Sequence, residues 1–106
     1  MARALIKISP NPRRGEVIEI KTLISHEMET GFRHTNTGVA IPRDIITTFV
    51  ATYNGEEIFS AQLFPAIAAN PFITFYTIAT ESGTLECRWS GDNGYALSEQ
   101  VKIAVE

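Results

Sequence analysis

Four residues of this chain have the side-chain types that bind copper in blue-copper sites, namely Cys87, His26, His34 and Met28. Such sites occur on β-sandwiches and take a cysteine, two histidines and a more distant methionine. They normally draw the cysteine, a histidine and the methionine from one loop near the C-terminus, whereas no histidine or methionine follows Cys87 here. Residue types without ligand spacing are weak evidence, so we expect no metal and no other cofactor.

Cys87 is the only thiol of the chain and therefore the one candidate for a sulfur nucleophile. A reactive thiolate needs exposure and a nearby cation or helix N-terminus. Arg88 is adjacent in sequence, but neighbouring side chains of a strand point to opposite faces. Cys87 instead shares its face with Leu85 and Trp89. We therefore predict a small buried side chain with no catalytic role.

The polar segment 25–42 contains both histidines and has no clear hydrophobic period. Two glutamates and an arginine lie between His26 and His34, and such a group could act as an acid–base pair or bind a metal. The chain has no nucleophile–base motif, glycine-rich phosphate loop or zinc spacing. Long loops are often functional or mobile, and a short hairpin extension around residues 35–38 is possible. We expect this loop to dock an incoming protein through His26, Met28, Arg33 and His34.

The most apolar part of the chain is the segment 58–89, which holds four of the six phenylalanines and the only tryptophan. No side chain in residues 58–80 is ionisable except that of Tyr76. Pro65 and Pro71 interrupt the segment, and each removes a backbone donor and disfavours helix at the preceding residue. A transmembrane helix needs about 20 consecutive apolar residues. The segment therefore predicts two strands joined by an apolar connection.

The length of 106 residues corresponds to one domain, residues 1–106, with a core large enough to fold without disulfides. The net charge of -3 argues against binding of nucleic acid or of an anionic membrane, because both need a basic surface. The N-terminus has no signal-peptide pattern. Taken alone, these features favour a cytoplasmic protein without membrane insertion.

Alternating apolar residues separated by turn sequences predict about seven strands and no helix. Asn54-Gly55 is a strong hairpin signal, because both residues tolerate positive φ. The segment 44–53 is apolar on both faces, as expected of a strand covered on both sides. This pattern predicts an all-β fold, an immunoglobulin-like antiparallel β-sandwich. The expected strands are 4–8, 18–24, 44–53, 56–63, 72–79, 85–89 and 101–105.

The apolar segment contains more apolar residues than a two-layer core needs, because a sandwich strand needs only one apolar face. One interpretation is a crossover buried within its own sandwich. We favour the other, a contact surface for a partner, since contiguous exposed apolar patches mark interaction sites. The residues expected on that surface are Phe59, Leu63, Phe64, Ile67, Pro71, Phe72 and Phe75.

Seven segments of the chain match the motifs of one protein family: RGEVIEIKTLISH (14–26), METG (28–31), PRDII (42–46), YNGEE (53–57), FPAIAANP (64–71), ATESG (79–83) and WSGDNG (89–94). Through them the chain resembles the SoxZ family over essentially its whole length. SoxZ is the smaller subunit of the SoxYZ sulfur-carrier complex of thiosulfate oxidation. This sequence differs at Glu27, where the family pattern His-Pro-Met-Glu-Thr-Gly has proline.

The resemblance implies a non-enzymatic scaffold subunit with an immunoglobulin-like fold. Its partner would be a SoxY-like carrier chain, which holds the sulfur intermediate on a cysteine in a flexible glycine-rich C-terminal arm. The pair would form a heterodimer and meet other Sox enzymes transiently. The resemblance also implies a periplasmic location, with export alongside the partner in place of a signal peptide of its own.

Two functions of other classes remain open from the residues. One is a free-standing thiol- or metal-dependent β-sandwich enzyme that uses Cys87 or the His26–His34 loop. The other is a homodimeric adhesion or structural domain. A neighbouring reading frame that encodes a chain with a glycine-flanked C-terminal cysteine would favour the carrier-partner interpretation over both.

Overall fold

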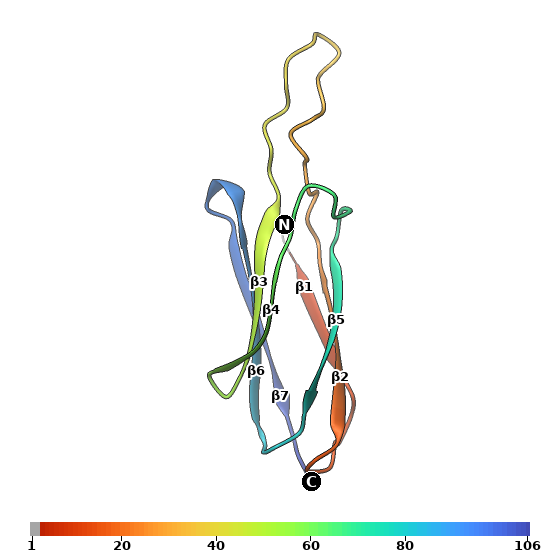
Figure 1. Ribbon diagram of the computed structural model, residues 1–106, viewed down its shortest axis with the longest axis vertical. Coiled ribbons are helices and arrows are strands. Elements are labelled where there is room, and N and C mark those ends of the chain that lie inside the picture. Colours follow the sequence, from red (N-terminus) through yellow and green to blue (C-terminus); the bar gives the residue numbers. More distant parts are fainter. Residues whose placement is uncertain (1–2) are drawn as a thin grey trace.

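The computed structural model describes residues 3–106, which form seven strands in two facing antiparallel sheets (Figure 1). The smaller sheet has the order β1-β2-β5 and contains β1 (Ala4–Ile8), β2 (Val17–Ile24) and β5 (Phe72–Ile78). The larger sheet has the order β4-β3-β6-β7 and contains β3 (Ile46–Tyr53), β4 (Glu56–Gln62), β6 (Gly83–Gly91) and β7 (Ala96–Ile103). A short 3₁₀ turn, η1 (Asp92–Gly94), joins β6 to β7. The predicted all-β sandwich is confirmed.

The last strand begins earlier than the sequence indicated. β7 starts at Ala96 and pairs with β6 from Ser90 onward, whereas the predicted strand began at Val101. The cause is Glu99, which faces the same side as Leu97 and Val101 and so interrupts the apolar alternation. Backbone pairing with β6 continues through the first half of this edge strand, where Leu97 packs against the core.

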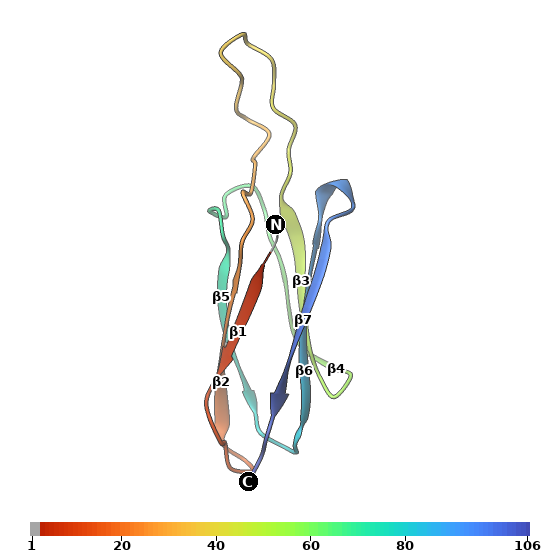
Figure 2. The ribbon, with the colours of Figure 1, turned by 180° about the vertical axis from the view of Figure 1, so that it is seen from behind.

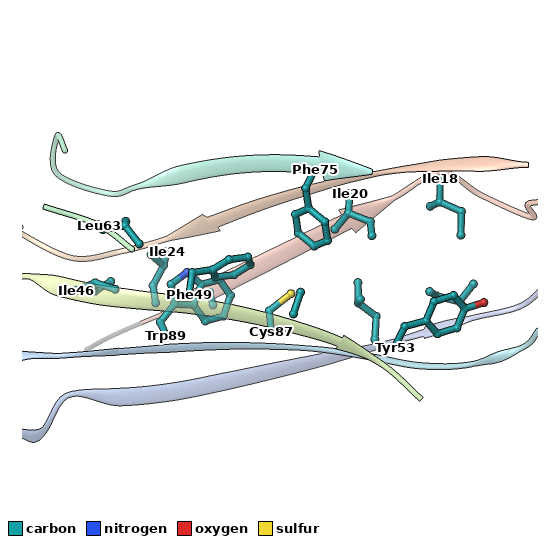
Figure 3. Close-up of a cluster of buried hydrophobic side chains, with 14 of the residues drawn as sticks. Ile18, Ile20, Ile24, Ile46, Phe49, Tyr53, Leu63, Phe75, Cys87 and Trp89 are labelled. Atoms are coloured by element: carbon teal, nitrogen blue, oxygen red, sulfur yellow. The ribbon is translucent and has the colours of Figure 1, made fainter. Parts of the chain in front are cut away.

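The inner faces of the two sheets supply the core, which Figure 3 shows in close-up. Phe49 of β3 lies at its centre, with ring centroids 5.2 Å from Trp89 and 5.8 Å from Phe75. Isoleucines of β2 close the core from the opposite sheet (Figure 3). The strand β3 is covered on one face only, because Val50 and its outward-facing neighbours are half-buried. The expectation that both faces of β3 are covered was therefore wrong. The high apolar content of β3 is explained by its central position in the larger sheet, between β4 and β6.

Two tight connections fix the register of the larger sheet. Asn54 and Gly55 have φ of 50° and 85°, as expected of the predicted two-residue hairpin between β3 and β4. The Tyr53 hydroxyl accepts hydrogen bonds from the backbone N–H groups of Thr80 and Glu81, both at 3.3 Å. This tyrosine, which is buried, thereby links the β3–β4 hairpin to the β5–β6 turn.

The segment between β2 and β3 forms a finger, defined here as residues 29–44, which projects beyond the end of the sandwich opposite the C-terminus (Figures 1 and 2). The molecule is 59 Å long and only 22 Å by 19 Å across. Backbone hydrogen bonds of 2.8 Å join Glu29 and Asp44 in both directions at the base of the finger. Near the tip, Thr35 donates to Val39 at 2.8 Å and Gly38 donates to Thr35 at 3.0 Å. The predicted hairpin extension around residues 35–38 is present.

Candidate functional site

Three of the seven residues expected to face a partner lie inside the sandwich. Leu63 and Phe75 expose only 5% and 3% of their surface, and Pro71 is also buried. Phe75 points inward from β5, and Leu63 and Pro71 sit at the two ends of the connection, residues 63–71. Their place in the expected surface was wrong, because the structure buries all three. Phe75 is buried by its inward position on β5, and Leu63 and Pro71 are buried where the connection meets the sandwich.

Phe59 is half-buried and does not offer a free surface either. Its ring stacks on Phe75 with centroids 4.8 Å apart and an interplanar angle of 8°. The two rings come from β4 and β5, which are edge strands of opposite sheets. Phe59 therefore closes the open side of the sandwich between its two edges.

The remaining three residues of the expected surface are exposed. Phe64 and Phe72 each expose 61% of their surface and Ile67 exposes 40%. Phe64 and Ile67 lie in the connection, where the Ile67 N–H donates to the Phe64 carbonyl at 2.9 Å in a turn. Phe72 begins β5 at the same end of the sandwich (Figure 1).

Phe72 belongs to a larger apolar surface on the smaller sheet that sequence reasoning missed. Its cross-strand neighbour is Leu23 of β2, whose own neighbour is Leu5 of β1, so the three side chains form one row across the sheet. Tyr76 and the facing pair Val17 and Ile78 continue the surface along the strands. All six side chains point outward, away from the core. We call this set the apolar outer face: Leu5, Val17, Leu23, Phe72, Tyr76 and Ile78.

A small pocket opens at the Leu5–Leu23 end of this face. It has a volume of about 200 Å³ and is lined by Arg3, Leu5, Leu23, Ile24, Ser25 and Asn70.

Charged residues lie between the apolar rows of this face. Lys7 and Lys21 lie opposite each other, and the Lys21 Nζ atom is 3.5 Å from a carboxylate oxygen of Glu19. The Tyr76 hydroxyl donates to Glu19 at 3.0 Å, and this hydrogen bond raises the pKa of Tyr76 above its usual value.

The outward face of the larger sheet has a different composition, and we call it the polar outer face. Glu86 accepts hydrogen bonds from Arg88 at 2.8 Å and from Gln100 at 3.0 Å. These two bonds hold the pKa of the Glu86 carboxyl below its usual value. Serines and threonines occupy most of the other outward positions, among which Val50 is the apolar member of β3. This side of the sandwich is therefore a solvated surface.

Two of the four predicted docking residues anchor the finger and are not displayed by it. Met28 is buried, and its sulfur accepts a hydrogen bond from the Ile46 N–H at 3.3 Å. The His26 side chain is 7% exposed, and its Nδ1 accepts the Met28 N–H at 2.9 Å. The Nε2 atom of His26 lies 3.9 Å from Asp44, and Tyr95 packs edge-on against the ring at 4.8 Å. Met28 therefore offers no surface to an incoming protein, and the observed role of His26 is to anchor the base of the finger.

Arg33 and His34, the other two predicted docking residues, lie exposed on the finger. Arg33 pairs with Glu29, with Nε 3.0 Å from Oε2, and this pairing lowers the pKa of the Glu29 carboxyl. The finger also exposes two apolar side chains, Phe32 at 77% and Val39 at 61%. At its base, Arg43 donates to both carboxylate oxygens of Asp92 at 2.8 and 2.9 Å. The finger is thus held in place while it displays apolar and cationic groups.

Cys87 lies in the core, as predicted (Figure 3). It shares its inward face of β6 with Leu85 and Trp89, which are also buried. Burial, with a smaller contribution from the Glu86 charge, raises the pKa of the Cys87 thiol to about 12. A thiol with such a pKa is almost entirely protonated at neutral pH, and the thiolate is the nucleophilic form. This cysteine therefore lacks both the exposure and the ionisation that a sulfur-carrying residue needs.

The four candidate copper ligands do not come together. Cys87 is in the middle of the core, His26 and Met28 are at the base of the finger, and His34 is near its tip. Within residues 3–106, no group of three or more His, Cys, Asp or Glu side chains is arranged to hold a metal ion. In the same residues no helix is long and apolar enough to cross a membrane.

Comparison with solved structures shows the fold. The superoxide reductase (neelaredoxin) from Ignicoccus hospitalis superposes with a TM-score of 0.73, 14% identity, and coverage of 97% of this chain and 80% of that chain. A single-residue variant of that enzyme gives a TM-score of 0.76 over 97% and 79% of the two chains, also at 14% identity. A candidate superoxide reductase from Thermotoga maritima gives 0.71 over 97% and 85%, again at 14% identity. At this identity the likeness concerns the β-sandwich alone.

Comparison at the level of sequence shows the family. No curated protein matches the chain. The family model for the sulphur oxidation protein SoxZ matches residues 6–102, from the first strand to the last. Because this match spans nearly the whole length, the chain belongs to the SoxZ family.

Proposed function

We propose that this chain is the non-catalytic scaffold subunit of a heterodimeric sulfur carrier of SoxYZ type. Family membership gives it a role in a Sox sulfur-oxidation system. The observation that carries the finer proposal is the state of Cys87, the chain's only cysteine, which is buried with its pKa raised to about 12. A chain whose only thiol is inert needs a second chain to hold the sulfur intermediate, and a SoxY-like subunit with a cysteine on its C-terminal arm fills that role.

The same proposal assigns two kinds of contact to the surface. The stable one is with the carrier subunit, because obligate interfaces are apolar and the chain exposes a large apolar surface. The transient one is with the enzymes that load and oxidise the carrier arm, and it uses the finger with Phe32, Arg33 and His34. The complex works in the periplasm, to which the chain is exported together with its partner.

Copurification tests this function. The chain is isolated from its native source under mild conditions, and the bound proteins are identified by mass spectrometry. We expect a stoichiometric SoxY-like chain, and we expect the pair to support thiosulfate oxidation with Cys87→Ser as well as with the wild type. A persulfide or thiosulfonate trapped on Cys87 during turnover, with activity lost in the Cys87→Ser variant, would overturn the proposal.

The docking role of the finger is tested by its effect on the rate of oxidation by the Sox enzymes. Phe32→Ala combined with Val39→Ala leaves the backbone hydrogen bonds of the finger intact, because neither side chain takes part in them. We expect the variant to copurify normally with the carrier subunit, whereas the Sox enzymes should oxidise the sulfur bound to that subunit more slowly. An unchanged oxidation rate over a range of enzyme concentrations would show that the finger is not a docking element.

A further inference from the structure

We propose that the apolar outer face of the smaller sheet is the surface that binds the carrier subunit. The proposal rests on the pairing proposed above and adds where that pairing takes place and what chemistry the partner's surface must have. The six residues of the face come from β1, β2 and β5 and, except for Phe72, lie outside the surface that the sequence indicated.

The fold does not use these side chains. The inward residues of the same strands, among them Ile18, Ile20 and Phe75, already fill the space between the sheets. The larger sheet also turns an apolar face to the core, yet its outer face is polar. At roughly 100 Å² of exposed surface each, the six side chains present about 600 Å² of largely apolar area, which approaches the 800 Å² that each partner gives to a standard interface.

The pocket beside Leu5 and Leu23 gives this face a place for an anchor. Its volume of about 200 Å³ is large enough for one aliphatic or aromatic side chain, and its lining is mostly apolar. Interfaces concentrate much of their binding energy in a few well-packed pockets. Phe72 flanks Leu23 in the adjoining strand, so the pocket and the row form one continuous feature.

The charges on the face indicate what the partner carries. Arg3, Lys7 and Lys21 contribute three positive charges and Glu19 contributes one negative charge, in a chain whose net charge is -3. A partner surface with an apolar centre and carboxylates opposite Lys7 and Lys21 complements this pattern. Two copies of this chain placed face to face would bring like charges together. The occupant is therefore a different chain, the carrier subunit.

The test compares phenylalanines that are exposed at different places. Phe72→Glu changes the apolar outer face, and Phe32→Glu makes the same substitution on the finger, where exposure is even greater. Binding of each full-length variant to the purified carrier subunit is measured by titration, with thermal melting as the control for folding. We expect Phe72→Glu to weaken pairing by about 30-fold or more and Phe32→Glu to change it by less than about threefold.

A second measurement does not depend on variants. Hydroxyl-radical footprinting of the wild-type chain, alone and in the complex, reports the accessibility of individual side chains. We expect oxidation of Phe72 and Tyr76 to fall at least about fivefold in the complex, because interface cores exclude water, while oxidation of Phe32 stays unchanged. A Phe72→Glu variant that fails to fold is then replaced by this readout.

The outcomes separate the two proposals. A wild-type chain that binds no carrier subunit overturns the proposed function, and the surface assignment with it. A wild-type chain that pairs while Phe72→Glu binds equally well, or while Phe72 and Tyr76 stay reactive in the complex, overturns the surface assignment and leaves the function standing.

Discussion

The two outer faces of the sandwich obey the same alternation but carry different residues. On the smaller sheet the outward positions include the row Leu5, Leu23 and Phe72. On the larger sheet the equivalent positions hold the hydrogen-bonded group of Glu86 and Arg88 with Gln100. Both sheets turn an apolar face to the core, which is all that folding requires of a sandwich. Folding therefore does not require the difference between the outer faces, and this difference is the basis of the proposed interface with the carrier subunit.

Two phenylalanines of β5 offer the sharpest test, because they lie three positions apart and therefore face opposite sides of the sheet. Phe75→Ala opens a cavity in the core beside Phe49, and we expect it to lower the free energy of unfolding by about 3–5 kcal/mol. Phe72→Ala removes an exposed ring, and we expect a change within about 0.5 kcal/mol. Urea titration of the isolated chain measures both, and comparable losses would show that Phe72 supports the fold.

A second contrast lies along β6. Cys87→Ser places a hydroxyl without a partner in the core, and we expect a cost of about 1–3 kcal/mol in the free energy of unfolding. Ser90→Ala at an exposed position of the same strand is the control, with an expected change within about 0.5 kcal/mol.

The thiol itself provides a chemical check on Cys87. Because its pKa is raised to about 12, the native wild-type chain should resist alkylation by iodoacetamide at pH 8 and react only after unfolding. Rapid labelling of the folded chain would contradict the burial of this residue.

Without its partner, the chain should self-associate weakly through the apolar outer face. Salt screens the repulsion between Lys7 and Lys21 of facing copies, so we expect self-association to strengthen by about tenfold between about 0.05 and 0.5 M salt. Pairing with the carrier subunit should weaken over the same range, because opposite charges meet there. Sedimentation velocity gives the first trend, and Phe72→Glu is expected to remain monomeric. Self-association that persists in this variant would place the contact elsewhere.

The connection sets the boundary of the apolar outer face. Phe64→Glu combined with Ile67→Asp should leave the fold intact, because both side chains are exposed. We expect the double variant to weaken carrier binding by up to about tenfold, less than Phe72→Glu, as is usual for the rim of an interface. Circular dichroism and the same titration check both statements, and a loss larger than that of Phe72→Glu would move the centre of the interface to the connection.

The smallest effect is expected on the polar outer face. The pKa of Glu86 is lowered by hydrogen bonds from Gln100 and Arg88, so its ionised form is favoured in the folded chain. The resulting stabilisation is complete above the unfolded pKa near 4.5 and is lost as the pH falls through the folded pKa. Glu86→Gln should therefore lower the Tm by only about 1–2 °C at pH 7, and the difference should shrink as the pH falls below 4.5. A difference that does not change with pH would show that charge is not its cause.

The sequence predicted the fold well because strand alternation and turn residues are local signals. Asn54-Gly55 identified its hairpin, and the inward register of Cys87 followed from Leu85 and Trp89. The late start predicted for β7 shows the limit of that logic, because an edge strand held by backbone pairing needs no apolar pattern.

The candidate surface was harder to predict because it depends on which strands become neighbours. Leu5 and Leu23 share their strand faces with charged residues, among them Lys7 and Lys21, and only the order β1-β2-β5 joins them to Phe72. Proximity in sequence suggested instead that the apolar connection forms the surface, which wrongly included Leu63, Pro71 and Phe75. The anchoring of His26 and Met28 likewise depends on contacts with Ile46 and Tyr95 that no local pattern encodes.

The construction of the finger also bears on how the family diversifies. Its hairpin is held by backbone hydrogen bonds and by the Arg43–Asp92 pair, so Phe32, His34 and Val39 can mutate without a cost to folding. Gly31 cannot, because it has φ of 89° and an added Cβ would lie 2.9 Å from that of Arg43. We expect homologues to retain this glycine while the exposed finger residues drift with the enzymes that each organism encodes, so that new docking specificities evolve on an unchanged sandwich.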